Sequence, residues 1–322
     1  MKFVISPSET GTEKEEISKE LFDVLIIGGG PAGYSSAIYS ARYMLKTILI
    51  TKEHGGAIVD AHQVENYPGF KNITGIELMN KFKEHVLYYN VPILNDEVIE
   101  INKKEKIFEV KTKTNEIYRS KTLILALGTM RRKLNLPNED KFIGKGLSYC
   151  AICDGYLFKN KVVCVIGGSD AAASSAILLS RYASKVYIIY RRDKLRAEPY
   201  WIDKINKTSN IEIIYNANVV EILGNEKVEG VKLDNGNSLK LDGIFVEIGS
   251  IPSTTLLKNI NIELDEQGYI VVDHLMRTNI EGVFAAGDVT NLYKHFRQVV
   301  VAAAQGAIAA YSAYSFLRKV KK

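Results

Sequence analysis

Residues 22–33 read FDVLIIGGGPAG, an apolar run that ends at a cluster of glycines. A short apolar run of this kind predicts a buried strand. Gly28, Gly30 and Gly33 have the G-x-G-x-x-G spacing of a dinucleotide-binding turn. There the first glycine permits a tight bend, the second lets the backbone approach a pyrophosphate, and the third allows the helix to pack closely on the strand.

The residues that follow complete a βαβ unit. We expect a helix over 34–44, rich in small residues, and a second strand over 47–50. The helix N-terminus, with Pro31 and Ala32 in the turn before it, would face a phosphate with free N–H groups. Glu53 is placed to bind a ribose hydroxyl. A glycine turn without a ligand is the alternative, which the combination of strand, turn, helix, strand and acid disfavours.

The same pattern recurs in the middle of the chain. We expect a strand over 161–166, a turn over 167–172, a helix over 173–182 and a strand over 185–190. The candidate nucleotide-contacting residues of this turn are Gly167, Gly168, Ser169, Asp170 and Ala171. Ser169 replaces the middle glycine, and its Cβ crowds the place where backbone must approach a pyrophosphate. The second turn therefore either binds a nucleotide or is a relic of one that did.

Three arginines come after the last strand of this second unit: Arg191, Arg192 and Arg196. Where an NAD site holds an acid, arginine accommodates the 2′-phosphate of NADP. A solvated basic turn is the alternative.

Cys150 and Cys153 form a Cys-x-x-Cys pair that is followed by Asp154. A zinc site would need two further ligands. The third cysteine, Cys164, lies in an apolar strand, and the five histidines show no ligand-like spacing. We therefore expect dithiol–disulfide chemistry at this pair, and a buried packing role for Cys164.

Composition excludes several classes of protein. The chain has 322 residues, of which 46% are hydrophobic and 25% charged, and this composition indicates a globular protein of about two domains. A net charge of +5 without long basic runs gives no support to nucleic-acid binding. Residues 1–20 are expected to be a loose polar extension without a signal peptide. The uncharged stretch 299–317, interrupted by Gln305, is expected to be a buried helix and not a membrane span, so we expect a cytoplasmic protein with no membrane association.

Further strands are expected over 107–112 and 228–233, and a strand from Gly282 leads into a turn at Gly287-Asp288. On spacing alone, Asp288 is as consistent with a plain turn as with contact to a diphosphate-bearing ligand.

Taken together, the motifs resemble those of low-molecular-weight thioredoxin reductases. The shared motifs, in chain order, are G-x-G-P-A-G, Gly55-Gly56, VENYPG at 64–69, CAICDG at 150–155, RRDKLRA at 191–197, FAAGD at 284–288 and Arg297-Gln298. The resemblance implies an α/β fold with two Rossmann-like three-layer domains, one inserted in the other. Residues 1–129 and 251–322 would bind FAD, residues 130–250 would bind NADPH and carry the cysteine pair, and the protein would be a homodimer.

The resemblance also implies roles for individual residues. Cys153 would lie nearest the flavin, Cys150 would attack the disulfide of a thioredoxin-like protein, and Asp154 would act as acid and base. The residues implied to contact FAD are Gly28, Gly30, Pro31, Ala32, Gly33, Glu53, Gly55, Gly56, Asn66, Gly128, Gly287, Asp288, Arg297 and Gln298.

The second nucleotide unit departs from the family pattern. Ser169 replaces a glycine, and Ser174 and Ser175 replace two glutamates. Tyr190 stands where the family has histidine. In the part of the chain implied to bind FAD, Ala57 stands where the family has glutamine after Gly55-Gly56. The three serines favour a donor other than NADPH, whereas Arg191, Arg192 and Arg196 favour NADPH. The sequence as a whole predicts an FAD-dependent thioredoxin reductase that takes electrons from NADPH. The alternative is a flavin disulfide reductase with another donor, such as ferredoxin. A non-enzymatic redox sensor is disfavoured, because a sensor has no need of a second nucleotide domain.

Overall fold

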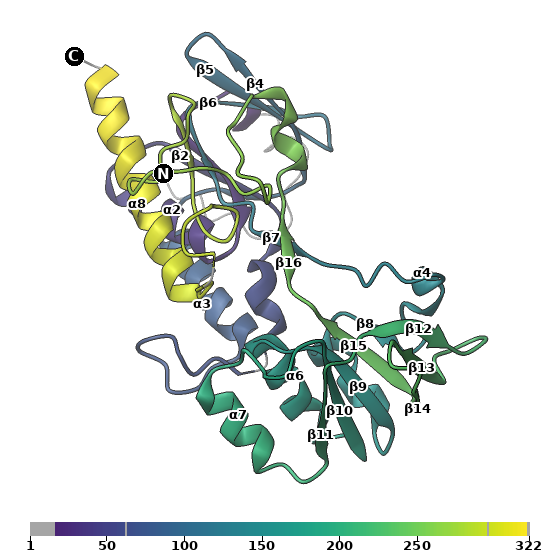
Figure 1. Cartoon of the computed structure of the whole chain (residues 1–322). Helices are drawn as coiled ribbons and strands as arrows, with labels where there is room; N and C mark the ends of the chain where they lie inside the picture. The colour runs from purple at the N-terminus through teal and green to yellow at the C-terminus, as the bar shows by residue number, and fades with distance from the viewer. Residues whose placement is uncertain (1–16, 62, 295, 321–322) are drawn as a thin grey trace. The chain divides into compact units, whose positions relative to one another are not determined.

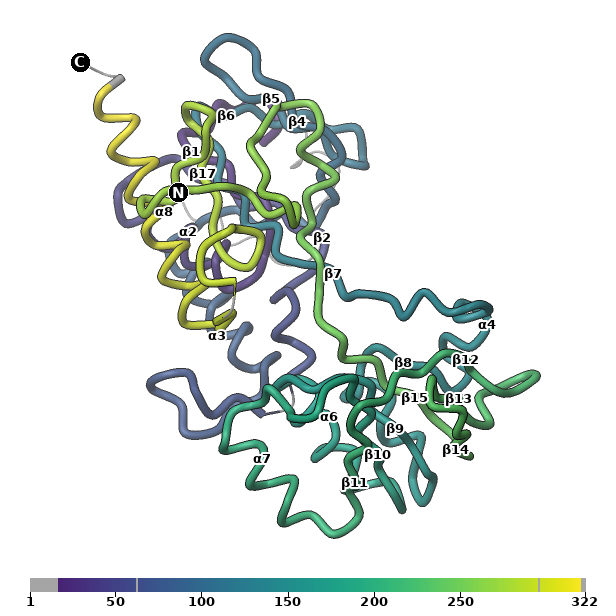
Figure 2. The backbone as a smooth tube through the Cα atoms, viewed as in Figure 1, coloured from purple at the N-terminus to yellow at the C-terminus, as the bar shows by residue number. Residues whose placement is uncertain are grey.

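The structure is a computed structural model that describes residues 17–61, 63–294 and 296–320 (Figure 1). The chain divides into two compact units. Unit 1 comprises residues 1–59, 64–130 and 252–322, and unit 2 comprises residues 60–63 and 131–251. The long segment of unit 2, residues 131–251, is joined to unit 1 through β7 (Thr129–Arg131) and β16 (Ser250–Pro252), two short strands that pair with each other. The smooth trace in Figure 2 follows these crossings.

Unit 1 is built on a seven-stranded sheet in the order β3-β2-β1-β6-β5-β4, with β17 also paired to β6. β1, β2, β3, β6 and β17 pair in parallel, whereas β4 and β5 form an antiparallel extension on β6. Their bounds are β1 Leu21–Gly29, β2 Thr47–His54, β3 Ile93–Asn95, β4 Val98–Lys104, β5 Ile107–Thr112, β6 Ile117–Leu125 and β17 Val283–Ala285. Because the central strands are covered on both faces, β1 buries Val24 to Ile27 in one continuous run.

Two helices of unit 1 pack closely because small residues face each other. α2 (Pro31–Arg42) contacts α8 (Val299–Val320), and a Cβ on Gly306 would lie 2.1 Å from the carbonyl oxygen of Ala32. The Ser36 hydroxyl lies 3.0 Å from the Gly306 carbonyl oxygen, which it can reach as a donor. The remaining helical segments are the 3₁₀ turn η1 (Gly56–Asp60), α3 (Gly75–Tyr88) and the 3₁₀ turn η3 (Thr255–Asn259).

By length and composition, α8 is long and apolar enough to cross a membrane. The core helix of a soluble protein passes the same test. In this structure α8 buries the polar side chains of Gln305 and Ser312 within unit 1, together with Ala309, Ala310 and Ala313.

Unit 2 is built on a five-stranded parallel sheet in the order β11-β10-β9-β15-β8. Its bounds are β8 Leu147–Ser148, β9 Val162–Gly167, β10 Lys185–Tyr190, β11 Ile211–Tyr215 and β15 Gly243–Glu247. The antiparallel strands β12 (Val219–Leu223), β13 (Gly230–Leu233) and β14 (Ser238–Lys240) form a separate small sheet. The helical segments are α4 Glu139–Phe142, α5 Ala151–Asp154, η2 Gly155–Phe158, α6 Asp170–Leu179 and α7 Pro199–Asn206.

The fold class expected from the sequence is confirmed: both units are α/β, and each contains a strand–glycine turn–helix–strand element. The helices begin three residues earlier than expected, at Pro31 and Asp170, because the glycine turns lead directly into them. The strand expected over 228–233 begins at Gly230. Of the expected N-terminal extension, residues 1–16 lie outside the described residues.

Candidate redox and nucleotide sites

The cysteine pair forms a disulfide in unit 2. Cys150 precedes α5 and Cys153 lies within it, with Cα atoms 5.3 Å apart. Cys153 is exposed and Cys150 is partly buried. The Sγ of Cys150 accepts the backbone N–H of Cys153 at 3.1 Å. A hydrogen bond of this kind would stabilise a thiolate on Cys150 once the disulfide is reduced.

Asp154 is held beside the pair by Ser148. The Ser148 hydroxyl lies 2.6 Å from Asp154 Oδ2 and accepts the backbone N–H of Cys150 at 2.9 Å. The structure thus links the expected acid–base residue to the backbone of Cys150 through one hydroxyl group.

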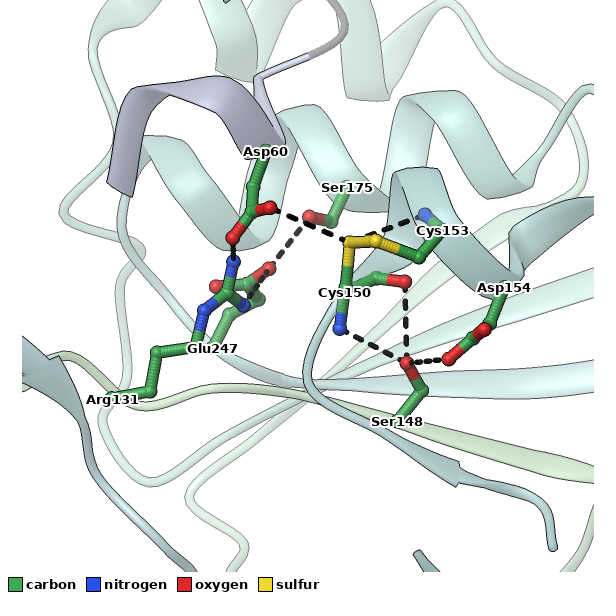
Figure 3. The surroundings of a disulfide bond; sticks show 8 residues. All are labelled: Asp60, Arg131, Ser148, Cys150, Cys153, Asp154, Ser175 and Glu247. Atoms are coloured by element: carbon green, nitrogen blue, oxygen red, sulfur yellow. Dashed lines mark hydrogen bonds and ion pairs between the residues drawn. A yellow bond between two sulfur atoms is a disulfide. The ribbon is translucent and has the colours of Figure 1, made fainter. Parts of the chain in front are cut away.

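A second carboxylate, which no sequence motif indicated, approaches the disulfide from the other side (Figure 3). Asp60 Oδ1 lies 3.7 Å from the Sγ of Cys150, and Asp60 Oδ2 accepts a hydrogen bond from Arg131. Arg131 Nη1 also lies 3.6 Å from Glu247 Oε1. No spacing rule connects residues 60, 131 and 247, so only the tertiary structure could bring them together.

Glu247 lies beside one of the departures from the family pattern. Ser175, where the family resemblance places a glutamate, donates a hydrogen bond to Glu247 Oε1 at 2.9 Å. Burial raises the pKa of Glu247, and the Arg131 guanidinium opposes that rise. The Glu247 carboxylate of β15 therefore lies beside Ser175 of α6, the position where the family resemblance places a glutamate.

The first glycine turn assembles the residues expected to hold a dinucleotide in unit 1. A Cβ on Gly33 would lie 1.8 Å from the Gly28 carbonyl oxygen, whereas one on Gly30 would meet no protein atom closer than 3.8 Å. Gly28 also adopts a φ of +114°, a conformation that favours glycine. Packing thus requires glycine at 28 and 33, whereas position 30 leaves room for a ligand against the backbone.

Two of the other expected dinucleotide residues of unit 1, Gly55 and Gly56, lie against this turn. The Gly55 N–H bonds to the Gly29 carbonyl oxygen at 2.8 Å, and a Cβ on Gly56 would lie 3.4 Å from Gly30 Cα. The Asn66 amide donates to Gln298 Oε1 at 3.0 Å, which joins segments 232 residues apart in the sequence. Glu53, at the end of β2, has an exposed side chain.

The Gly287-Asp288 turn lies against α2. A Cβ on Gly287 would lie 3.0 Å from the Cβ of Ala32, and the Gly287 N–H donates to Gln305 Oε1 at 2.6 Å. Burial raises the pKa of Asp288, and the Arg297 guanidinium opposes that rise. Gln305 therefore holds the Gly287-Asp288 turn, although the sequence marks it only as a break in the apolar run of the last helix. Gly128 has a φ of +61°, and a Cβ there would meet no atom within 4 Å, so it too leaves open space.

The second glycine turn, in unit 2, has a similar backbone and different side chains. Ser169 has φ −96° and ψ 179°, close to the −86° and −173° of Gly30. The Tyr190 ring covers Gly168, where a Cβ would lie 2.5 Å from ring carbons, and a Cβ on Gly167 would lie 2.2 Å from the Glu247 carbonyl oxygen. The serine is accommodated in the turn without a strained backbone.

Charges around the second turn have both signs. Asp170 Oδ1 accepts a hydrogen bond from the Glu198 N–H at 2.7 Å. Burial raises the pKa of the Glu198 carboxyl, and the nearby Asp170 charge raises it further. Arg191, Arg192 and Arg196 are exposed, and within the described residues no acid forms an ion pair with them. Ala171, in the first turn of α6, is exposed as well.

Comparison with known proteins agrees with this geometry. The sequence profile of pyridine nucleotide-disulphide oxidoreductases matches residues 22–306. The chain belongs to this family. A thioredoxin reductase of Listeria monocytogenes is 39% identical over 311 residues, which cover 94% of this chain and 96% of the relative.

Solved structures of two kinds of thioredoxin reductase match this member of the family. The thioredoxin reductase of T. acidophilum is 42% identical, covers 92% of this chain and 99% of its own, and superposes with a TM-score of 0.87. A ferredoxin-flavin thioredoxin reductase from Clostridium acetobutylicum is 36% identical, covers 93% and 99%, and superposes with a TM-score of 0.51.

Proposed function

We propose that this protein is an FAD-dependent thioredoxin reductase, a cytoplasmic homodimer that reduces a thioredoxin-like protein through the Cys150–Cys153 pair. The disulfide carries the proposal, because it lies beside two carboxylates in a chain whose relatives are thioredoxin reductases. In size-exclusion chromatography with light scattering, the purified protein should have twice the mass of one chain.

The residues around the first glycine turn fit FAD. Position 30 leaves backbone open to a pyrophosphate, while Asn66, Gln298 and the Gly287-Asp288 turn converge from distant segments. FAD bound there would take electrons from the donor and supply two electrons to the disulfide. Purified protein should be yellow, and protein that stays colourless when FAD is added would contradict the proposal.

The chain's own residues manage the protons and the sulfur chemistry. Two electrons and two protons convert the Cys150–Cys153 disulfide to a dithiol, and we assign the proton transfer to Asp154, whose carboxylate is held by Ser148. The Cys150 thiolate, stabilised by the Cys153 N–H, then attacks the acceptor disulfide, and Cys153 resolves the mixed disulfide. The acceptor leaves as a dithiol and the enzyme disulfide is restored.

The order of the two sulfurs is tested by trapping. We expect Cys153→Ser to accumulate a mixed disulfide with thioredoxin through Cys150, detected by non-reducing electrophoresis and peptide mass. Accumulation on Cys150→Ser instead would mean that Cys153, the more exposed of the two, attacks the acceptor disulfide.

For the donor, we propose NADPH. Arg191, Arg192 and Arg196 are free of acidic partners within the described residues and offer charge-assisted bonds of about 1.5–3 kcal/mol each to a 2′-phosphate. Ser169 opposes NADPH binding only through its side chain, because its backbone dihedral angles are similar to those of Gly30. We therefore expect NADPH to be preferred over NADH, with Ser169→Gly tightening NADPH binding and the Arg191→Ala/Arg192→Ala double variant removing the preference.

Ferredoxin is the second candidate donor. It is favoured by Ser169, by the Asp170 and Glu198 carboxylates at the second turn, and by the similarity to a ferredoxin-flavin thioredoxin reductase. Anaerobic titration separates the two. If NADPH leaves the flavin unbleached while reduced ferredoxin bleaches it, ferredoxin is the donor and the arginines form a surface patch.

A further inference from the structure

We propose that Cys150, Cys153 and Asp60 form a binding site for a thiophilic divalent cation, such as Zn²⁺, that exists only while the disulfide is reduced. The proposal extends the proposed function, since it requires only that the pair be reducible. The sequence alone offered two ligands, and the third comes from a residue 90 positions away from Cys150.

One pair of ligand atoms, Cys150 Sγ and Asp60 Oδ1, already lies at the spacing of a tetrahedral site, while the two sulfurs are bonded to each other. One ligand atom from each of the three residues lies within 4.8 Å of the other two, and Cys150 Sγ is 3.7 Å from Asp60 Oδ1. Zinc bonds of about 2.3 Å to sulfur and about 2.0–2.2 Å to oxygen place those two ligand atoms roughly 3.5 Å apart. Once reduced, the two sulfurs are free to separate to the spacing of two ligands on one ion.

The Asp60 carboxylate is oriented for this role by its other oxygen. Arg131 binds Oδ2 and leaves Oδ1 directed at the sulfur. Glu247 lies 3.6 Å from Arg131 and balances its charge, so the guanidinium adds little net repulsion to an incoming cation. Metal-binding carboxylates are commonly held by such outer hydrogen bonds.

Three protein ligands leave one coordination position for water. Cys153 is exposed, so solvent can reach the ion. Asp154 does not belong to the group of described residues whose ligand atoms lie within 4.8 Å of one another, so Asp60 and not Asp154 is the third ligand. Catalytic zinc sites have this arrangement of three protein ligands and one position open to water.

Metal binding would follow reduction of the disulfide. Reduction adds two electrons and two protons to the disulfide, supplied by the enzyme's own donor or by a phosphine reductant. The cation then displaces the two thiol protons and bonds to both sulfurs and to Asp60. Because both thiolates are occupied, exchange with a protein disulfide stops until the ion leaves. The cation would therefore inhibit the reduced enzyme reversibly.

The test uses the FAD-loaded full chain, reduced anaerobically with a phosphine and titrated with Zn²⁺ against a chromophoric chelator. We expect one Zn²⁺ per reduced chain and none per oxidised chain. Asp60→Asn should weaken binding by at least about tenfold, and Asp60→His, which restores a zinc ligand, should recover it. Asp154→Asn is the matched control and should bind as the wild type does. Co²⁺ in place of Zn²⁺ should give the intense ligand-field bands of a tetrahedral thiolate site, and Cys150→Ser should lose them.

Zinc binding by the oxidised chain, or equal affinity in Asp60→Asn with its flavin content unchanged, would overturn the proposal. This binding measurement needs neither NADPH nor thioredoxin. A chain that binds Zn²⁺ as expected and fails to reduce thioredoxin would refute the proposed function alone.

Discussion

Among single residues, surroundings give identical cysteines different chemistry. Cys150 and Cys153 are bonded at the start of α5 beside Asp60 and Asp154, whereas Cys164 is fully buried in β9. Burial raises the pKa of the Cys164 thiol far above its ordinary value, so that no reactive thiolate forms there.

We expect two thiols, not three, to react with iodoacetamide in the reduced native protein. The third should react only after unfolding in urea, and peptide mass should identify it as Cys164. Alkylation of Cys164 in the folded protein at the rate of the other two would contradict its burial.

Glu247 predicts a pH-dependent stability. Its pKa is raised in the folded state, so the folded protein binds more protons than the unfolded chain above the ordinary pKa of 4.5. The contribution of Glu247 to stability is therefore greatest below pH 4.5 and is lost as pH rises through the folded pKa.

Urea unfolding measured from pH 4.5 to neutrality should show this difference. The wild type should lose stability relative to Glu247→Gln as pH rises. Glu226→Gln, at an exposed position, is the control and should follow the wild type. Parallel curves for the wild type and Glu247→Gln would mean that the burial of this carboxylate has no energetic cost.

Among the helices and turns, the two glycine turns show which glycines serve packing and which serve a ligand. α2 can approach β1 only because Gly33 has no side chain. Gly30, the N-cap of the same helix, has an extended conformation that any residue adopts, and a Cβ there would make only ordinary van der Waals contacts, at 3.8 Å or more.

Gly30→Ala and Gly33→Ala should therefore fail in different ways. Gly30→Ala should keep the unfolding midpoint of the FAD-free protein but bind FAD more weakly, because the added methyl group occupies the pyrophosphate side of the turn. Gly33→Ala should destabilise the FAD-free protein itself, by about 1–3 kcal/mol as for overpacking. Calorimetry of FAD-free protein and fluorescence titration with FAD measure the two effects, and identical behaviour of the variants would contradict this division.

The contact between α8 and the Gly287-Asp288 turn depends on Gln305. Its amide oxygen accepts the Gly287 N–H, and the side chain is 3% exposed. Gln305→Leu would leave that N–H buried without a partner, at a cost of about 1–3 kcal/mol. We expect the loss to be measurable by urea unfolding and to be accompanied by weaker FAD binding, since Asp288 follows Gly287. An unchanged midpoint would mean that water replaces the amide.

The molecule as a whole forms two units with separate cores. Each has its own sheet, and the chain connects them through β7 and β16. The residues proposed to bind FAD lie in unit 1, and the disulfide lies in unit 2.

This division predicts two calorimetric transitions for the FAD-free protein. Added FAD should raise only the transition temperature of unit 1, because a ligand stabilises the unit that binds it. At an FAD concentration of 100 times Kd, the free energy of unfolding of unit 1 should increase by about 2.7 kcal/mol. Limited proteolysis at each transition temperature would assign the units. A single transition that shifts as a whole would show that the two units unfold together.

Local patterns along the chain were enough to predict the fold class, the two nucleotide-type turns, the cysteine pair and the family. A glycine is needed where φ is positive or where a carbonyl would lie within about 2 Å of a Cβ, and a Cys-x-x-Cys spacing is short enough to close a disulfide. Which distant residues meet became known only from the folded chain. Asp60 reaches Cys150, Glu247 accepts a hydrogen bond from Ser175, and Gln305 binds the Gly287 N–H. Such contacts depend on how whole strands and helices pack, and no periodicity along the chain encodes them.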